Sequence, residues 1–205
     1  MREDHFTNHS DFAGALGKAV LRSGDDNELL LGSLWTDQPA ALIFVRHFGC
    51  IGCSENVSLL APRLPELVQL GFRVAIIGCG APLFIQGFRE RNRLLHLPIE
   101  VFSDEKLESY QQLRLAYGFR YGLGPRGVYE MAKAFIQGHR SSDLQGDPRQ
   151  QAGALLIDQE GMVHFYHRNE SLGDHVSPSA LIEAALTLRA KLNQGRALKT
   201  SVGEV

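Results

Sequence analysis

Short, mainly apolar segments recur along the chain, each bounded by Gly, Pro or a cluster of polar residues. They are too short for buried helices, so they predict strands that are covered on both faces. The polar run Asp158 to Gly161 separates the last two and predicts a hairpin turn. The predicted strands are 40–45, 72–77, 99–102, 154–157 and 163–167.

Between these strands, apolar residues are spaced as on one face of a helix. Pro62 and Pro65 should split the first of these helices, because proline cannot donate the backbone hydrogen bond of a helix interior. Ser103 and Asp104 are suited to cap the third. The predicted helices are 53–70, 82–94, 105–116, 125–137 and a closing helix from Ser177 and Pro178.

The order of these elements predicts an α/β fold. Near the N-terminus, residues 18–34 form two short strands around the turn residues 24–27. Strands that alternate with helices indicate a parallel sheet, and the final hairpin adds antiparallel strands. A central mixed sheet flanked by helices is the thioredoxin-like architecture, here with an N-terminal hairpin extension and an extra helix. We expect one domain over 18–194, with tails at 1–17 and 195–205.

The composition narrows the function further. The chain has 205 residues, of which 44% are hydrophobic, and a formal net charge of -2. That charge provides no field to hold nucleic acid or an anionic membrane, so we expect neither partner. The polar start of the chain does not resemble a signal peptide, and no apolar run is long enough to span a membrane. A cytoplasmic location is the expectation.

Cys50 and Cys53 lie where a predicted strand passes into a helix. Unpaired N–H groups at a helix N-terminus favour a thiolate, and two intervening residues bring the sulfurs close enough for a disulfide. Cys50 would attack an oxidant and Cys53 would resolve the product. Two alternatives remain: a zinc or iron–sulfur site completed by the cysteines of two subunits, and a thioredoxin-like domain that senses oxidation without turnover.

Other side chains are candidates for supporting roles. Arg46 and His47 precede the cysteines, and a cation there would lower the pKa of Cys50; alternation along the strand makes the two face opposite ways, and we favour His47 over Arg46. Cys79 ends the next strand and is either a third thiol near the site or a packing residue. Five histidines lack metal-ligand spacing and are assigned surface or core roles: His5, His9, His164, His167 and His175.

The segment from Phe44 to Glu55, FVRHFGCIGCSE, resembles the peroxiredoxin-like branch of the alkyl hydroperoxide reductase and thiol-specific antioxidant superfamily, which includes prostamide/prostaglandin F synthase-like proteins. The resemblance extends over roughly 28–190 and includes Ser103, Asp104 and 151–158. It implies a thioredoxin fold with Cys50 as the reactive thiol and Cys53 as its partner. It also implies a peroxide or disulfide substrate, and an external thiol reductant such as thioredoxin or glutathione in place of a bound cofactor.

The sequence departs from that pattern at several places. Ile43 and His47 occupy the positions of a proline and a threonine that precede the reactive cysteine in peroxiredoxins, and Ala152 occupies that of their peroxide-orienting arginine. Gly153 is the nearest match to the cis-proline of thioredoxins. We therefore expect slow turnover with hydrogen peroxide, unless another arginine substitutes. The candidates are Arg46, Arg120 and Arg126.

The sequence leaves the oligomeric state open, with a homodimer as one alternative. The polar segment 138–151 and the helix predicted before it are plausible interface elements.

Overall fold

A computed structural model describes residues 9–115, 149–170 and 174–202. Within these ranges the strands form a single mixed sheet of seven strands. The strands are β1 (Val20–Arg22), β2 (Glu28–Leu30), β3 (Ala40–His47), β4 (Arg73–Cys79), β5 (Glu100–Ser103), β6 (Gly153–Ile157) and β7 (Val163–Arg168). Their order is β2-β1-β5-β4-β3-β6-β7. Strands β3, β4 and β5 are parallel, whereas β6 and β7 continue the sheet as an antiparallel hairpin.

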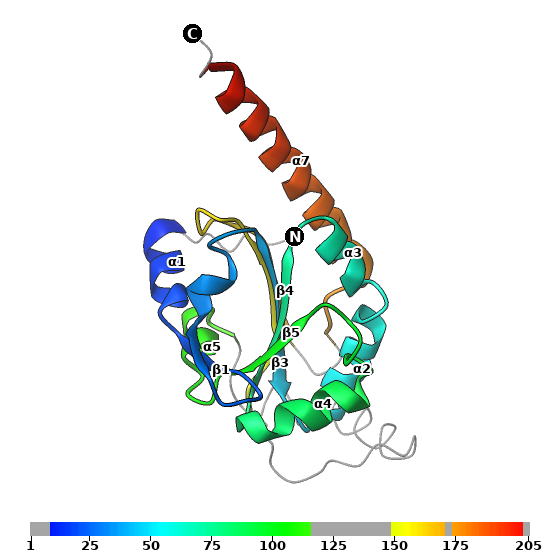
Figure 1. Ribbon diagram of the computed structural model, residues 1–205. Helices are drawn as coiled ribbons and strands as arrows, with labels where there is room; N and C mark the ends of the chain where they lie inside the picture. Colours follow the sequence, from blue (N-terminus) through cyan, green and yellow to red (C-terminus); the bar gives the residue numbers. More distant parts are fainter. Residues whose placement is uncertain (1–8, 116–148, 171–173, 203–205) are drawn as a thin grey trace.

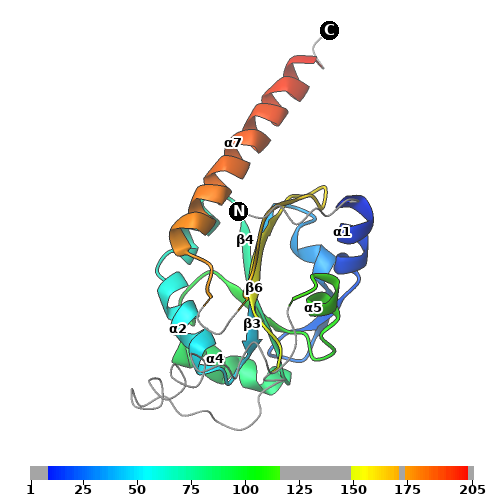
Figure 2. The same ribbon diagram turned by 180° about the vertical axis from the view of Figure 1, so that it is seen from behind.

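Helices cover both faces of this sheet (Figures 1 and 2). One face carries α1 (His9–Gly17) and α5 (Glu108–Gln112), together with the short 3-10 helix η1 (Leu31–Leu34). The other face carries α2 (Ile51–Leu60), α3 (Leu64–Gln69), α4 (Ile85–Arg91), which follows η2 (Pro82–Phe84), and the first part of α7 (Pro178–Val202). The rest of α7 projects beyond the sheet (Figure 1).

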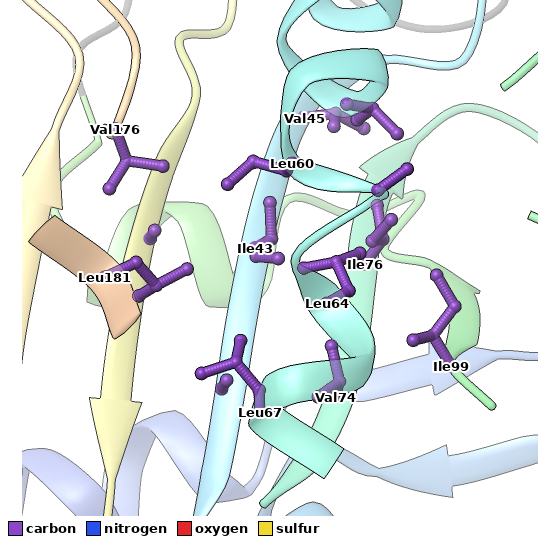
Figure 3. Packing of buried hydrophobic residues seen from close by; sticks show 14 of the residues in the cluster. Ile43, Val45, Leu60, Leu64, Leu67, Val74, Ile76, Ile99, Val176 and Leu181 are labelled. Atoms are coloured by element: carbon purple, nitrogen blue, oxygen red, sulfur yellow. The ribbon is translucent and has the colours of Figure 1, made fainter. Parts of the chain in front are cut away.

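Alternate residues of the central strands fill two separate apolar clusters. Ile43 and Val45 of β3 and Ile76 of β4 pack toward α2, α3 and α7, as Figure 3 shows. Leu42 and Phe44 of β3 point to the other face, where they pack with residues of α1, η1 and α5. Because both faces are covered, the middle of each of these strands is a continuous apolar run, and the charged residues of β3 and β4 lie at the strand ends.

The predicted strands, both hairpins and the thioredoxin-like fold class are confirmed. The first long helix is split, with α2 ending at Leu60 and α3 beginning at Leu64. The N-cap residue of the third helix is Leu107, but the carboxylate of Asp104 accepts the backbone N–H groups of Glu108 and Ser109 at 3.1 and 2.8 Å. The Ser103 hydroxyl donates to the Gly80 carbonyl instead of capping the helix. That helix begins at Glu108 rather than near residue 105, since Leu107 adopts a left-handed backbone with φ 58°.

The segments expected to be tails contain helices. Residues 9–17 form α1, and its buried side chains Ala13 and Leu16 belong to the described core. Several small residues in this segment weaken its apolar periodicity, so the sequence does not predict the helix. At the other end, α7 continues to Val202 instead of ending near 194. The predicted helix 125–137 and most of the polar segment 138–151 lie outside the described residues.

None of the described helices combines the length and the apolar character that a membrane crossing requires.

Candidate active site

Cys50 occupies the N-cap position of α2, directly after the loop that follows β3. Its Sγ accepts a hydrogen bond from the backbone N–H of Cys53 at 3.2 Å, and its own N–H donates to the carbonyl of His47 at 3.1 Å. A cap residue with an extended backbone normally presents a side-chain oxygen to these N–H groups. Here a sulfur takes that place, so the start of the helix stabilises negative charge on Cys50.

The two cysteines have opposite acidities. A hydrogen bond from the Cys53 thiol lowers the pKa of Cys50 to about 6, and the charge of Arg46 and the backbone N–H groups of Gly52 and Cys53 act in the same direction against the effect of burial. Burial raises the pKa of Cys53 well above the ordinary value, and the neighbouring Cys50 raises it further. At neutral pH this arrangement gives a Cys50 thiolate beside a protonated Cys53 thiol.

Buried aromatic rings position the loop before Cys50. The ring of Phe48 lies over Gly78 of β4, where a Cβ atom would come within 2.6 Å of it. The same ring packs against Phe88 of α4, with centroids 5.3 Å apart. Arg91, at the end of α4, donates to the Phe48 carbonyl at 2.6 Å. The position of the thiolate is therefore fixed from both β4 and α4.

The main chain of Arg46 forms hydrogen bonds with the sulfurs of Cys53 and Cys79. Its N–H donates to Cys53 Sγ at 3.2 Å, and its carbonyl accepts from the thiol of Cys79 at 2.8 Å. These groups are available because the pairing of β3 with β4 shifts register between Val45 and His47. The irregularity at the end of β3 thus brings all three cysteines around one residue.

A small pocket opens beside the cysteines, with a volume of about 10 Å³. Strand β3, helix α2 and the segments before β6 and after β7 contribute to its wall. Room of this size holds about one water molecule. Its lining residues are Val45, Arg46, Cys50, Gly52, Cys53, Asn56, Ala152, Asn169 and His175.

Two lining side chains present polar atoms that the described residues do not satisfy. Nε and Nη1 of Arg46 are buried, and neither has a hydrogen-bond partner within the described ranges. The same holds for Oδ1 of Asn56, a residue that is only 5% exposed. Buried polar groups normally have hydrogen-bond partners. The two donors of Arg46 and the acceptor of Asn56 are therefore suited to bind a polar ligand beside the Cys50 thiolate.

Comparison with known proteins identifies the family. The family model described as AhpC/TSA antioxidant enzyme matches residues 59–171, more than half of the chain. The chain belongs to the AhpC/TSA family. The match begins after Cys50 and Cys53, so it carries no information about their roles.

Individual relatives agree with this membership, and a solved structure shares the fold. The chain is 26% identical over 182 residues to Peroxiredoxin-like 2C of Mus musculus, covering 83% of this chain and 79% of that protein. It is 30% identical over 192 residues to Prostamide/prostaglandin F synthase of Salmo salar, covering 88% and 90%. Its fold is similar to that of the bacterioferritin comigratory protein of Xanthomonas campestris, with a TM-score of 0.61 at 13% identity, covering 86% of this chain and 95% of that one.

In this AhpC/TSA protein, the residues predicted to support Cys50 and Cys53 differ in whether they line the pocket. Arg46 belongs to the pocket lining and its charge lowers the pKa of Cys50, whereas the backbone carbonyl of His47 accepts the N–H of Cys50. Cys79 is buried behind the pocket, bound to the carbonyl of Arg46. Ala152 does line the pocket, and Arg46 of β3 is the arginine in its described lining.

Gly153 has a packing role in the structure. It pairs with Phe44 of β3 and with Arg168 of β7. A Cβ atom there would lie 2.7 Å from Leu115 Cδ2 and 2.8 Å from the carbonyl oxygen of His167. It does not belong to the described lining of the pocket. No cis peptide bond occurs in the described ranges.

Sequence reasoning missed three lining residues: Asn56, Asn169 and His175. Asn56 could have been found, because it lies three residues after Cys53 and therefore on the same side of α2. Asn169 and His175 carried no local signal. Asn169 reaches the pocket because its N–H donates to the Ala152 carbonyl at 3.1 Å, and its Nδ2 lies 3.5 Å from His175 Nδ1.

Among the described side chains, no three or more His, Cys, Asp or Glu residues gather in a group that could hold a metal ion.

Proposed function

We propose that this chain is a thiol-dependent oxidoreductase in which Cys50 attacks a peroxide or disulfide and Cys53 resolves the product. The observation that carries the proposal is the pairing at the start of α2. Cys50, its pKa lowered to about 6, accepts the Cys53 backbone N–H, and both residues line one pocket. Family membership supports the reaction class, and the two acidities support the division of roles.

The chemistry with a peroxide has two steps. The Cys50 thiolate attacks one oxygen of ROOH, the O–O bond breaks, and with one proton the products are Cys50 sulfenic acid and ROH. The Cys53 thiol then attacks the Cys50 sulfur, giving an intramolecular disulfide and water. With a disulfide RSSR, the first step gives a mixed disulfide and RS⁻, and Cys53 releases the second RSH.

The unpartnered polar atoms of the pocket favour a peroxide as the oxidant. The buried Nε and Nη1 of Arg46 can donate to peroxide oxygens, and Oδ1 of Asn56 can accept from a peroxide O–H. Arg46 could therefore serve in place of the arginine that the sequence lacks at position 152.

An external thiol must complete the cycle. The Cys50–Cys53 disulfide would be reduced by a dithiol protein such as thioredoxin, or by glutathione, so the reaction needs no bound cofactor. A cytoplasmic location would suit this requirement, since such thiols are kept reduced there.

The deciding experiment is mass spectrometry of the reduced protein before and after one equivalent of hydrogen peroxide, followed by thiol titration. We expect a loss of two hydrogens that requires both Cys50 and Cys53. Cys53→Ser should stop at an oxidised Cys50 that a sulfenic-acid reagent can trap. Cys50→Ser should remain unmodified.

Cys79→Ser is the matched control, because this third cysteine is also buried but bound to a backbone carbonyl. It should still lose two hydrogens. Two thiols that react only after treatment with a chelator would contradict the proposal and favour the metal alternative. Oxidation that persists in Cys50→Ser would also contradict it.

A further inference from the structure

Resolution requires the Cys53 thiol to lose its proton. Cys53 is 4% exposed, and burial raises its pKa well above the ordinary value. A thiolate is the nucleophile in disulfide formation, so the resolving step is slow unless a nearby group takes this proton. The proposed function does not yet include such a group.

His175 supplies a suitable group. It lies in the segment between β7 and α7, and it lines the same pocket as both active-site cysteines. Apart from the cysteines, the described lining contains one other ionisable residue, Arg46, which is always charged and cannot accept a proton. In the described lining of the pocket, the imidazole of His175 is therefore the side chain that can act as a general base.

We propose that His175 accepts the proton of Cys53 in the resolving step and passes it to the group that leaves Cys50. This inference rests on the proposed function and assigns a further residue to it. The pocket has room for about one water molecule, so the transfer can span it through a single bridging water.

The proton balance is the same for either oxidant. When Cys53 attacks Cys50 sulfenic acid, the S–S bond forms, the S–O bond breaks, and the proton moves from Cys53 through His175 to the departing hydroxide, which leaves as water. When Cys53 attacks a mixed disulfide, the departing thiolate RS⁻ takes the proton and leaves as RSH. His175 is neutral before and after the step.

The charges around His175 come from several elements. Glu55 on α2 and Asp174 beside it raise the pKa of the imidazole, while Arg46 on β3 and His167 on β7 lower it. Burial is the largest effect, and the net result is a pKa below the ordinary value of 6.5. The imidazole is therefore neutral at pH 7 and has a lone pair available for a proton.

The test isolates the resolving step with a small probe. One equivalent of methyl methanethiosulfonate converts the Cys50 thiolate to an S-methyl mixed disulfide and releases methanesulfinate. Cys53 then closes the disulfide and releases methanethiol. Acid quenching followed by mass spectrometry of the intact protein measures both steps, because the adduct first appears and then disappears.

We expect His175→Gln to form the adduct at nearly the wild-type rate and to close the disulfide about 100-fold more slowly at pH 7, within the usual range for general base catalysis. The closure rate of His175→Gln should rise steadily with pH as hydroxide replaces the base. His175→Ala should behave alike, and added imidazole should restore part of its closure rate.

His164→Gln is the matched control. His164 is a half-buried histidine of β7 that lies 2.6 Å from Asp158 and does not line the pocket. Both of its steps should match the wild type. Closure by His175→Gln within threefold of the wild type, or an equal slowing of both steps, would overturn the role of His175. An adduct that never closes in the wild type would instead overturn the proposed role of Cys53.

Discussion

The backbone N–H of Cys53 donates to the sulfur of Cys50 at 3.2 Å, so the first turn of α2 binds the sulfur that it presents to the pocket. This contact and the Cys53 thiol lower the pKa of Cys50 to about 6. The rate of Cys50 alkylation by iodoacetamide should therefore rise with pH, with a midpoint near 6, and reach a plateau above pH 7. Peptide mapping of quenched samples measures this rate for Cys50 alone.

The same shift makes stability depend on pH. The folded pKa of about 6 lies below the ordinary value of 9.0, so between these values the unfolded chain binds more protons than the folded one. The free energy of unfolding of the reduced protein should therefore rise with pH across this window. The stability that the Cys50 thiolate contributes should be lost as the pH falls through 6. Cys50→Ser should lack this rise. An alkylation midpoint near 9 would contradict both expectations.

Arg46 should influence Cys50 through charge and the substrate through its N–H groups. Arg46→Gln removes the charge that lowers the pKa of Cys50, so the alkylation midpoint should move upward. Arg46→Lys keeps a positive charge, so its alkylation midpoint should stay close to that of the wild type. Neither glutamine nor lysine has the forked N–H donors of arginine. Both variants should therefore react with hydrogen peroxide about tenfold more slowly above the midpoint, equivalent to one lost hydrogen bond to a charged group. Acid quenching followed by mass spectrometry of the intact protein can follow this reaction.

Equal loss of alkylation and peroxide reactivity in Arg46→Lys would show that Arg46 acts only on the thiolate. An unchanged midpoint in Arg46→Gln would remove the electrostatic role.

Much of the site could be predicted from local pattern. The position of Cys50 at a strand-to-helix junction follows from the apolar run 40–45 and the helical spacing after Cys53, and both are short-range signals. Strand alternation alone does not decide whether Arg46 or His47 lies near Cys50, because it assumes a regular strand. The register shift after Val45 alters the pairing at the end of β3, and such irregularities have no sequence signature of their own.

The remote part of the pocket could not be predicted for a different reason. Asn169 and His175 come to the pocket through the pairing of β6 with β3 and β7, which joins segments that are far apart in the sequence. The helix α1 was missed because its apolar face is formed by small residues as well as Leu16. In each case tertiary packing, rather than local propensity, determined the outcome.

Gly78 should tolerate no side chain. A Cβ atom there would lie 2.6 Å from Cε1 of Phe48, whose ring is fully buried, so Gly78→Ala forces the loop before Cys50 to move. Overpacking of this kind costs about 1–3 kcal/mol, and we expect a matching loss in the free energy of unfolding by urea. The displaced loop should also shift the alkylation midpoint of Cys50.

Gly87→Ala on α4 is the control, because nothing lies within 4 Å of the added Cβ. Alanine in a helix is favoured over glycine by roughly 0.5–1 kcal/mol, so this variant should be more stable than the wild type. If the two variants gave the same stability, the contact between Gly78 and Phe48 would not determine the position of the loop.

Tyr110 should stabilise the irregular end of β3 through its hydroxyl. This hydroxyl lies 2.6 Å from the Val45 carbonyl and 3.0 Å from the Ile77 carbonyl, and the two acceptors share its single hydrogen. Tyr110→Phe keeps the edge-to-face packing on Phe44 but leaves the two buried acceptors without this donor, at a cost of about 1–3 kcal/mol. Urea unfolding measures the loss.

Tyr166→Phe is the control, because the Tyr166 hydroxyl is only half-buried where it donates to the Leu113 carbonyl. This variant should lose less stability, since water can replace the missing donor. Equal losses would show that the hydroxyl of Tyr110 has no special role at the end of β3. A larger loss for Tyr110→Phe, with a changed alkylation midpoint for Cys50, would show that the face of the sheet opposite α2 helps to place the reactive sulfur.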